Sequence, residues 1–324
     1  MNIEIKAIEY YLPPRTEDGK TLTGDNPDWR IAEIEQKTGI LTRHVAAIDQ
    51  TATDMAALAA EKLFVSGIEK EEIDFLILIT QSPDYVLPTS ACILQDTLGL
   101  KKSCMAFDIN LGCSGFVYGL AIGGALCEAG FGKKGLVICS ETYSKYIDKS
   151  DRVCRPLFSD AAAATLLGSA TSDNLGPFDL GTDGSGFSDL IVRSSGARNA
   201  NKNSDERRLF MDGAKVLLFT MDAVPQCVMT LLKKSQKTID DIDLFVFHQA
   251  SKMVIYNIID KLKIPEKKIF LNSHRVGNTV SASIPIALKD ALQQGCLKKG
   301  DQIMLIGFGV GYSWGGCLIR WGDM

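Results

Sequence analysis

Residues 110–135, NLGCSGFVYGLAIGGALCEAGFGKKG, and residues 274–300, HRVGNTVSASIPIALKDALQQGCLKKG, can be aligned with each other. In the first stretch Cys113 precedes the first lysine of a Lys-Lys-Gly triplet by 20 residues, and Asn278 has the same spacing in the second. Agreement at a fixed spacing indicates an internal repeat, which bears on the architecture of the whole chain. The sequence therefore predicts a duplicated fold in which Cys113 and Asn278 hold equivalent positions.

Each copy also carries the same order of strands and helices. The stretches EEIDFLILITQ (71–81) and DDIDLFVFHQ (240–249) pair an acidic start with an apolar run, which is typical of a strand buried on both faces. A further apolar run follows each aligned stretch, LVICSE (136–141) and QIMLIGFG (302–309). Strands that alternate with helices favour parallel sheets covered on both faces. We therefore expect two similar α/β halves, joined near the polar segment 169–177.

The composition is typical of a soluble globular protein. Of 324 residues, 46% are hydrophobic, and 35 basic side chains against 39 acidic ones give a net charge of -4. This charge offers no basic field for nucleic acid or an anionic membrane, and no run of about 18 apolar residues predicts a membrane span. The nine cysteines lack CxxC spacing and the N-terminus lacks the apolar core of a signal peptide, so we expect a cytoplasmic protein.

Cys113 has a sequence context that the other cysteines lack. Gly112 and Gly115 flank Cys113 and Ser114 at a predicted strand-to-helix turn, and an apolar helix follows at once. The start of a helix exposes N–H groups and carries positive potential, which lowers the pKa of a thiol. The alternative is a small buried residue without chemistry, as most cysteines are. The turn favours a nucleophilic thiolate at Cys113.

His248 and Asn278 are the next candidates. His248 follows an apolar run, and it could be a satisfied core residue or the partner of a catalytic cysteine. Asn278 could be a helix cap, or it could donate a hydrogen bond to an oxyanion. Because α/β sheets bind ligands at the carboxyl ends of their strands, we expect the three side chains to meet in one site. Cysteine, histidine and asparagine without an acidic partner favour carbonyl and enolate stabilisation over hydrolysis.

The glycine-rich segment GFGVGYSWGG (307–316) is a fourth candidate element. It lacks the spacing and the following helix of a nucleotide-binding motif, but it could present a backbone N–H group to the site. No cluster of histidine, cysteine or carboxylate side chains has the spacing of metal ligands, so we expect no metal.

Together these motifs resemble the thiolase superfamily and, within it, the β-ketoacyl-acyl-carrier-protein synthase III family. The resemblance covers essentially the whole chain and is most specific in GCSGF, in HQA (248–250) and in GNTVSASIP (277–285). The other matching segments are TGILTRH (38–44), Asp151-Arg152, FSDAAAA (158–164), DGS (183–185) and the closing GFGVGYSWGG.

The resemblance implies an α/β fold of two thiolase-like halves, layered α-β-α-β-α with mixed five-stranded sheets. It implies an N-terminal half over residues 1–171 that carries the cysteine, and a C-terminal half over residues 172–324 that carries the histidine and the asparagine. It also implies a homodimer without a cofactor, because CoA thioesters serve as substrates.

The resemblance further implies an acyltransferase that works in two steps. Cys113 takes an acyl group from acyl-CoA, with the backbone N–H groups of Cys113 and Val310 as the oxyanion hole. Malonyl-acyl carrier protein then loses carbon dioxide, and His248 and Asn278 stabilise the enolate that attacks the acyl-enzyme. The products are 3-oxoacyl-acyl carrier protein, carbon dioxide and CoA. Decarboxylation generates the carbanion, so no strong base is required.

Other family positions are matched less closely. Lys37 and Arg152 are candidates for contacts with CoA, and Lys252 is the candidate for docking the carrier protein. Leu87 occupies the place where a bulky aromatic side chain often crosses the dimer to cap the acyl pocket. Ser251 replaces the asparagine of the usual HQAN motif.

Other functions are also considered. The departures at Ser251 and Val310 favour an acyltransferase of the same family that moves an acyl group to oxygen, nitrogen or sulfur without decarboxylation. A non-catalytic partner subunit is a further alternative, although the intact set of three candidate residues argues against it. An HMG-CoA synthase is disfavoured by Gln81, because those enzymes have a glutamate after the first buried strand.

Overall fold

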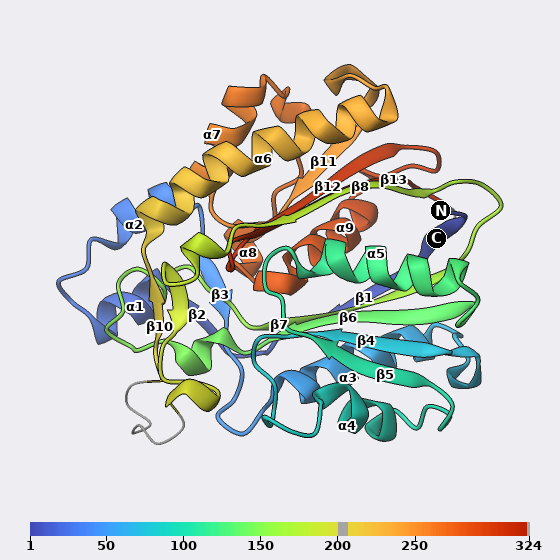
Figure 1. Ribbon diagram of the computed structural model, residues 1–324. Coiled ribbons are helices and arrows are strands. Elements are labelled where there is room, and N and C mark those ends of the chain that lie inside the picture. Colours follow the sequence, from blue (N-terminus) through green and yellow to red (C-terminus); the bar gives the residue numbers. More distant parts are fainter. Residues whose placement is uncertain (200–206, 323–324) are drawn as a thin grey trace.

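Two β-sheets, with helices between and outside them, make up the computed structural model of the chain (Figure 1). The structure describes residues 1–199 and 207–322. The first sheet has the strand order β1 (Ile3–Tyr11), β7 (Ala161–Ser169), β6 (Lys134–Glu141), β4 (Phe75–Ile79) and β5 (Met105–Ile109). β4 pairs in parallel with β5 and β6, whereas β7 runs antiparallel to β6 and β1.

The second sheet repeats this plan in the order β11 (Leu244–Phe247), β12 (Gln302–Gly309), β13 (Ser313–Arg320) and β8 (Leu175–Thr182). β11 and β12 are parallel, and the other two pairs are antiparallel. Both sheets are therefore mixed, as the family resemblance implies, and the expectation of parallel sheets from the alternating pattern is right only for β4, β5 and β6 and for β11 and β12. Antiparallel neighbours such as β12 and β13 need only a tight turn between them, and this explains the difference.

The expectation of five strands in the second sheet is wrong for the described residues. The place that corresponds to β5 holds a single bridge between Phe245 and Ile269. A one-turn 3-10 helix at Glu266–Lys268 precedes Ile269, and the short helix α8 (Ser273–Val276) follows soon after it. Too few residues stay extended between these turns to form a paired strand.

Helices cover both faces of each sheet. In chain order the main helices are α3 (Ala52–Val65), α4 (Ser90–Thr97), α5 (Gly115–Glu128), α6 (Gly213–Ser235), α7 (Lys252–Leu262) and α9 (Ser283–Gln293). α3 and α4 pack outside the first sheet, α5 and α9 lie between the sheets, and α6 and α7 cover the second (Figure 1). The predicted α-β-α-β-α layering of a thiolase-like fold is confirmed.

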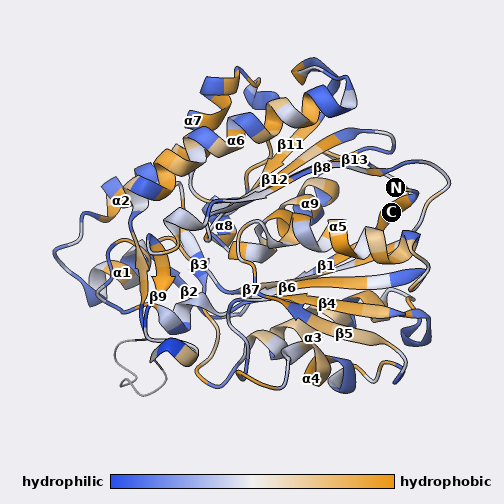
Figure 2. Cartoon of the chain, viewed as in Figure 1, coloured by the Kyte–Doolittle hydropathy of each residue, from blue (hydrophilic) through white to orange (hydrophobic). Residues whose placement is uncertain are grey.

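Hydropathy explains the place of each helix. The outer helices α6 and α7 carry hydrophobic and hydrophilic residues on different faces, whereas α5 carries few hydrophilic residues (Figure 2). α5 lies against sheets on both sides, and its glycines let it lie close to them. A Cβ atom at Gly119 would be 2.5 Å from Ile79 Cδ1, so a larger residue there would push α5 away from β4.

By length and composition alone, α6 is apolar enough to cross a membrane. Asp222 interrupts its apolar residues in the sequence, and Pro225 lies inside the helix. Its buried residues Val224, Val228 and Leu231 belong to the core cluster that packs on the second sheet. Core helices of this kind pass the same test of length and hydropathy, and we interpret α6 as one of them.

Short elements gather at one end of the two sheets, on the left in Figure 1. They are β2 (Thr16–Asp18), α1 (Gly19–Asp25), α2 (Ile31–Thr38), β3 (Thr42–His44), β9 (Leu190–Val192) and β10 (Leu209–Met211). β2 pairs with β3, and β9 pairs with β10. These elements form the side of the molecule on which the candidate site lies.

The two sheets separate near the predicted boundary. The last strand of the first sheet ends at Ser169, and the first strand of the second begins at Leu175. The predicted division into residues 1–171 and 172–324 falls between them. Since α5 and α9 form one core cluster with both sheets, the division into two domains stays a prediction.

Candidate active site

Cys113 lies in the turn that links β5 to α5. The N–H of Gly115 donates to the carbonyl of Gly112 at 2.8 Å, and Ser114 is the N-cap residue of the helix. The cysteine therefore lies in the turn directly before the helix, where the sequence predicts a strand-to-helix turn. Its side chain is 5% exposed and belongs to an apolar cluster.

The pKa of the Cys113 thiol differs from the sequence prediction. Burial, followed by the nearby carboxyl group of Glu141, raises this pKa from 9.0 to about 12. The backbone N–H groups of Val310 and Cys113 lower it, but burial outweighs them. At neutral pH Cys113 is therefore a thiol, and its predicted role as a nucleophile requires that it lose this proton during the attack.

Two glycines let the loop at the end of β12 approach this cysteine. A Cβ atom at Gly307 would lie 2.6 Å from the carbonyl oxygen of Cys113, and one at Gly309 would lie 2.9 Å from its Sγ atom. Only glycine therefore fits at these two positions beside Cys113. The loop brings the N–H of Val310 to the sulfur, where the resemblance implies half of an oxyanion hole.

His248 follows β11 and is 2% exposed. Its Nδ1 atom lies 2.7 Å from the Oγ atom of Ser283, the first residue of α9, and Phe308 packs edge-on against its ring. Burial lowers the pKa of His248 from 6.5 to about 3, so the ring is neutral at physiological pH. Because a hydroxyl can donate or accept, Ser283 supports either neutral tautomer.

Asn278 lies in the turn between α8 and the short 3-10 helix Val280–Ala282. Its Oδ1 atom accepts a hydrogen bond from the N–H of Val280 at 3.0 Å, which leaves the Nδ2 group as the donor. Val280 has a φ of 53°, a left-handed conformation that is rare for a β-branched residue. Backbone strain of this kind clusters at functional sites, where the surrounding structure enforces it.

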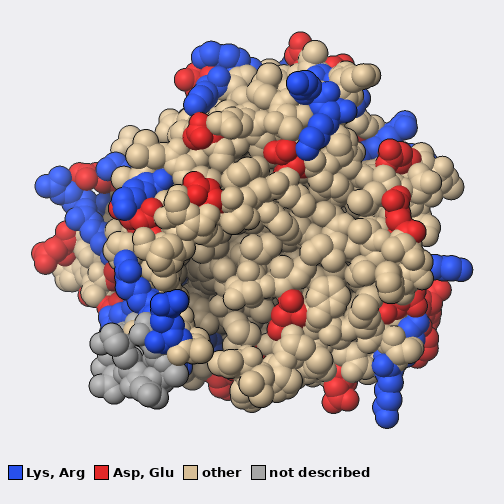
Figure 3. Space-filling model, in the orientation of Figure 1, with Lys and Arg blue, Asp and Glu red and all other residues tan. Residues whose placement is uncertain are grey.

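Cys113, His248 and Asn278 line one cavity of about 190 Å³, which we call the entrance cavity. Most of its other lining residues are apolar, among them Leu190 and Phe308. Figure 3 shows a hollow in this face of the molecule, with Lys and Arg side chains gathered to its left. The structure thus brings the three predicted residues together, while their catalytic roles stay a prediction.

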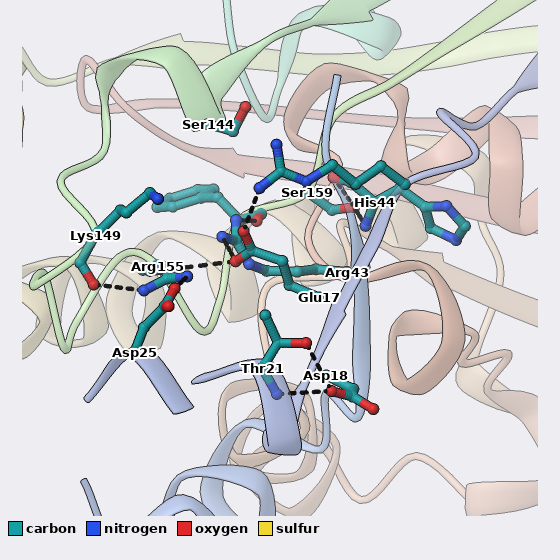
Figure 4. Close-up of polar contacts among 12 residues, drawn as sticks. Glu17, Asp18, Thr21, Asp25, Arg43, His44, Ser144, Lys149, Arg155 and Ser159 are labelled. Carbon is teal, nitrogen blue, oxygen red and sulfur yellow. Dashed lines mark hydrogen bonds and ion pairs between the residues drawn. The ribbon is translucent and has the colours of Figure 1, made fainter. Parts of the chain in front are cut away.

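A buried network of charges holds the chain beside Asn278 (Figure 4). The carboxylate of Glu17 lies between the guanidinium groups of Arg43 and Arg155, and all three side chains are at most 5% exposed. Arg43 also donates to the carbonyl of Phe158 at 3.1 Å. Phe158 in turn forms a parallel bridge with Asn278. The first half therefore fixes the backbone that carries the asparagine of the second half.

Glu141, at the end of β6, is a second buried carboxyl group between the halves. It accepts hydrogen bonds from Ser82 Oγ at 2.8 Å, from the N–H of Gln81 at 3.0 Å and from Ser281 Oγ at 2.9 Å. Burial raises the pKa of Glu141 from 4.5 to about 8, because no cation faces it in these contacts. Through Ser281 it holds the segment that follows Asn278.

The other predicted residues lie around the entrance cavity or away from it. Lys37 lines the cavity and is exposed, and Arg152 is an exposed neighbour of the lining residue Val153. Lys252 is exposed at the start of α7 beside the lining residues Ser251 and Met253.

Leu87 is 79% exposed and does not line the entrance cavity. It also does not line a second cavity, described below, that contains Gln81 and Val310. A role in the acyl pocket therefore requires the Leu87 of another copy of the chain, as the resemblance implies. This role stays a prediction.

Three residues, Ser251, Ser283 and Glu141, have roles that the sequence analysis missed. Ser251 is the N-cap residue of α7 and accepts a hydrogen bond from the N–H of Val254 at 3.3 Å. A serine before an amphipathic helix is a recognisable cap signal. Ser283 and Glu141 carry no such local signal, because their partners lie 35 and 140 residues away, respectively.

No group of three or more histidine, cysteine, aspartate or glutamate side chains could hold a metal ion within residues 1–199 and 207–322. All nine cysteines fall in these ranges and are free.

The fold and the site define a class, the condensing enzymes with the thiolase fold. Residues 107–184 match the family model of 3-oxoacyl-[acyl-carrier-protein] synthase III, and residues 232–321 match the model of its C-terminal part. The β-ketoacyl-[acyl-carrier-protein] synthase III of Fusobacterium nucleatum is 35% identical over 99% of both chains. The chain therefore belongs to the β-ketoacyl-[acyl-carrier-protein] synthase III family.

Solved structures agree with this assignment. A crystal structure of a 3-oxoacyl-(acyl-carrier-protein) synthase III superposes with a TM-score of 0.94 at 40% identity, over 99% of this chain and 100% of the other. The enzyme of Pseudomonas aeruginosa superposes with a TM-score of 0.92 at 32% identity, over 100% of this chain and 99% of the other. The chain is thus an acyl-transferring condensing enzyme with the function of a 3-oxoacyl-[acyl-carrier-protein] synthase III.

Proposed function

We propose that Cys113 takes an acyl group from acyl-CoA and that the acyl-enzyme then condenses with malonyl-acyl carrier protein. The observation that carries this proposal is the single cavity lined by Cys113, His248 and Asn278. The proposal assigns the nucleophile to the first half of the chain and the two side-chain donors to the second.

In the first step the thiol of Cys113 attacks the thioester carbonyl of acyl-CoA. The raised pKa of Cys113 means that its proton must be accepted during the attack, and the neutral His248 in the same cavity can accept it. The N–H groups of Cys113 and Val310 stabilise the oxyanion. The tetrahedral intermediate then expels CoA, whose sulfur takes the proton back from the imidazole.

In the second step malonyl-acyl carrier protein occupies the entrance cavity. Cleavage of the bond to its carboxylate releases carbon dioxide and leaves the electron pair as an enolate. His248 and the Nδ2 group of Asn278 donate hydrogen bonds to the enolate oxygen. The enolate carbon attacks the acyl carbonyl, and Cys113 leaves as a thiolate that takes one proton from water to return to the thiol. The product is a 3-oxoacyl chain on the carrier protein.

Exposed basic residues support contacts with the two thioester substrates. We assign Lys37, which lines the cavity, and Arg152, which is exposed next to the lining residue Val153, to pairing with the phosphates of CoA. We assign Lys252, which is exposed at the start of α7, to pairing with an acidic carrier protein. Charge pairs at an exposed rim act mainly on the association rate, and this rate falls with salt. We place the enzyme in the cytoplasm, where CoA thioesters are available.

An open sheet edge supports a homodimer. β5 is the edge strand of the first sheet, and its five residues are only partly buried. Beside this sheet the loop after β4 exposes Tyr85, Val86 and Leu87, which are 62%, 90% and 79% exposed. An unpaired strand and an apolar loop are features that a partner subunit covers. Sedimentation of the purified chain should give a dimer, and a stable monomer would contradict this part of the proposal.

Release of carbon dioxide tests the proposed reaction. The enzyme is incubated with acetyl-CoA and with malonyl-acyl carrier protein that is labelled in its free carboxyl group. We expect labelled carbon dioxide and 3-oxoacyl-acyl carrier protein in equal amounts. Acyl transfer without labelled carbon dioxide would instead favour the acyltransferase alternative, and no transfer at all would overturn both.

A further inference from the structure

A second cavity, of about 220 Å³, shares Leu190 with the entrance cavity and is also lined by Val310, in the loop after β12. We call it the inner cavity. Its lining combines apolar side chains, among them Leu190 and Val310, with the polar side chains of Gln81, Asn110 and Tyr143. This volume is many times the roughly 10 to 15 Å³ that one water molecule needs, so a short acyl chain fits in it.

The inner cavity is the space open to an acyl chain on Cys113. Leu190 lines both cavities, and the side chains of Gln81 and Val310 meet beside the cysteine turn. A Cβ atom at Gly112 would lie 2.6 Å from Gln81 Oε1 and 2.8 Å from Val310 Cγ1. In the proposed reaction the second thioester occupies the entrance cavity, so the acyl chain must extend the other way. This step rests on the proposed function.

Three polar side chains in this lining form a hydrogen-bonded row. The hydroxyl of Tyr143 donates to Gln81 Oε1 at 2.5 Å, and Gln81 Nε2 donates to Asn110 Oδ1 at 3.2 Å. Tyr143 is 3% exposed, and burial raises the pKa of its phenol well above 10.0. The phenol therefore stays neutral and keeps its proton for Gln81.

The row leaves one donor and one acceptor for a ligand. After the bonds within the row, Gln81 Nε2 has a second hydrogen, and the Tyr143 oxygen has a lone pair. A hydroxyl group satisfies both, because it accepts from the amide and donates to the phenol oxygen. A pure hydrocarbon chain would cover these two groups without giving them partners, which costs binding free energy.

We infer that the acyl substrate of this enzyme is a short hydroxyacyl group whose hydroxyl binds between Gln81 and Tyr143. The methylene groups of the chain pack against the apolar lining residues, among them Leu190 and Val310. An unpaired buried polar group weakens binding enough to give a preference of about tenfold or more over the matching alkyl chain.

Competition between two CoA thioesters tests this inference. The enzyme is mixed with equal amounts of 3-hydroxybutyryl-CoA and butyryl-CoA, and the two Cys113 adducts, which differ by one oxygen atom, are compared by mass spectrometry. The hydroxybutyryl adduct should dominate by about tenfold or more. In Tyr143→Phe and Gln81→Leu this ratio should fall to about one or below. Because the ratio is taken within one sample, it does not depend on the amount of folded enzyme.

Tyr118→Phe is the matched control. It also removes a phenol hydroxyl from a partly buried position, where the hydroxyl donates to Gly181 O at 3.1 Å outside the inner cavity. Its ratio should equal that of the unchanged enzyme. A ratio that favours butyryl in the unchanged enzyme, or that is the same in Tyr143→Phe and Gln81→Leu, would overturn the inference. Absence of both adducts would overturn the nucleophile proposal instead.

Discussion

The two halves of the molecule share one plan of strands, yet they place different chemistry at corresponding ends. In the first half the turn after β5 carries Cys113, and in the second the turn before α9 carries Asn278, with His248 at the end of β11. The sulfur of Cys113 receives its own backbone N–H from the first turn and the N–H of Val310 from the second half, whereas the N–H of Val280 fixes the side chain of Asn278. Duplication thus lets one copy hold a nucleophile and the other hold donors, on a shared cavity.

The halves also differ in what anchors them. Two buried carboxyl groups of the first half hold the segment around Asn278: Glu17 acts through Arg43 and Phe158, and Glu141 through Ser281. The pKa of Glu17 is lowered because the two arginines outweigh its burial, whereas the pKa of Glu141 is raised by burial. The catalytic segment of the second half is therefore positioned largely by the first.

Loss of the nucleophile should have the largest effect. We expect Cys113→Ala to lower the rate of 3-oxoacyl product formation by at least roughly 10³-fold, because no acyl-enzyme can form. Product formation from acetyl-CoA and malonyl-acyl carrier protein measures this. Cys296→Ala, at an exposed cysteine, is the control and should keep full activity. Substantial product formation by Cys113→Ala would show that Cys113, in the first half of the chain, is not the nucleophile.

Changes in the second half should slow the same reaction less. His248→Ala and Asn278→Asp each remove a donor to the enolate oxygen, and each should lower the rate by roughly 10² to 10³-fold. Asn278→Asp retains an oxygen that can accept from the N–H of Val280, so the turn is preserved. Asn26→Asp, which lies outside the cavity, serves as its control and should leave the rate unchanged. An unchanged rate in Asn278→Asp would exclude a donor role for the amide.

Local patterns in the sequence predict most of the strands, helices and site residues that the two halves share or divide between them. The repeated apolar runs predict β4 and β11, the aligned stretches predict α5 and α9, and the three candidate residues do line one cavity. The missing fifth strand depends on how Ile269 is crowded between two turns, which apolar patterning does not record.

Effects of burial were not predictable in the same way. The raised pKa of the Cys113 thiol results from side chains that surround it only after folding, while the sequence analysis considered only the helix start. The contacts of Glu141 and Ser283 likewise join distant segments. The inner cavity combines residues from Gln81 to Val310, so its polar row becomes visible only in the structure.

Glu17→Gln should destabilise the fold by about 3 kcal/mol, because it leaves the buried guanidinium group of Arg43 without its carboxylate and that of Arg155 with only Asp25. The pKa of Glu17 is lowered from 4.5, so its contribution is present above that pH and is lost as the pH falls below it. Urea denaturation at neutral and at acidic pH measures both effects. The difference from the unchanged protein should shrink at acidic pH, and a constant difference would contradict the charge-pair interpretation.

Glu141→Gln should show the opposite dependence on pH, with a smaller effect. With a pKa raised from 4.5 to about 8, the folded protein binds a proton in this range that the unfolded chain lacks. The contribution of Glu141 to stability therefore falls as the pH rises through this window, and glutamine has no such dependence. The stability of Glu141→Gln relative to the unchanged protein should rise by roughly 1 kcal/mol or more across the window. A flat difference in urea denaturation would exclude the raised pKa.

Mass spectrometry of the acyl-enzyme in two stages tests the division of labour between the halves most directly. The unchanged enzyme, Cys113→Ala and Asn278→Asp are first given acetyl-CoA and then malonyl-acyl carrier protein. We predict an adduct on Cys113 in the unchanged enzyme that disappears in the second stage, no adduct in Cys113→Ala, and an adduct in Asn278→Asp that persists. An adduct in Cys113→Ala, or rapid discharge in Asn278→Asp, would contradict the assignment of the nucleophile to the first half and the enolate donors to the second.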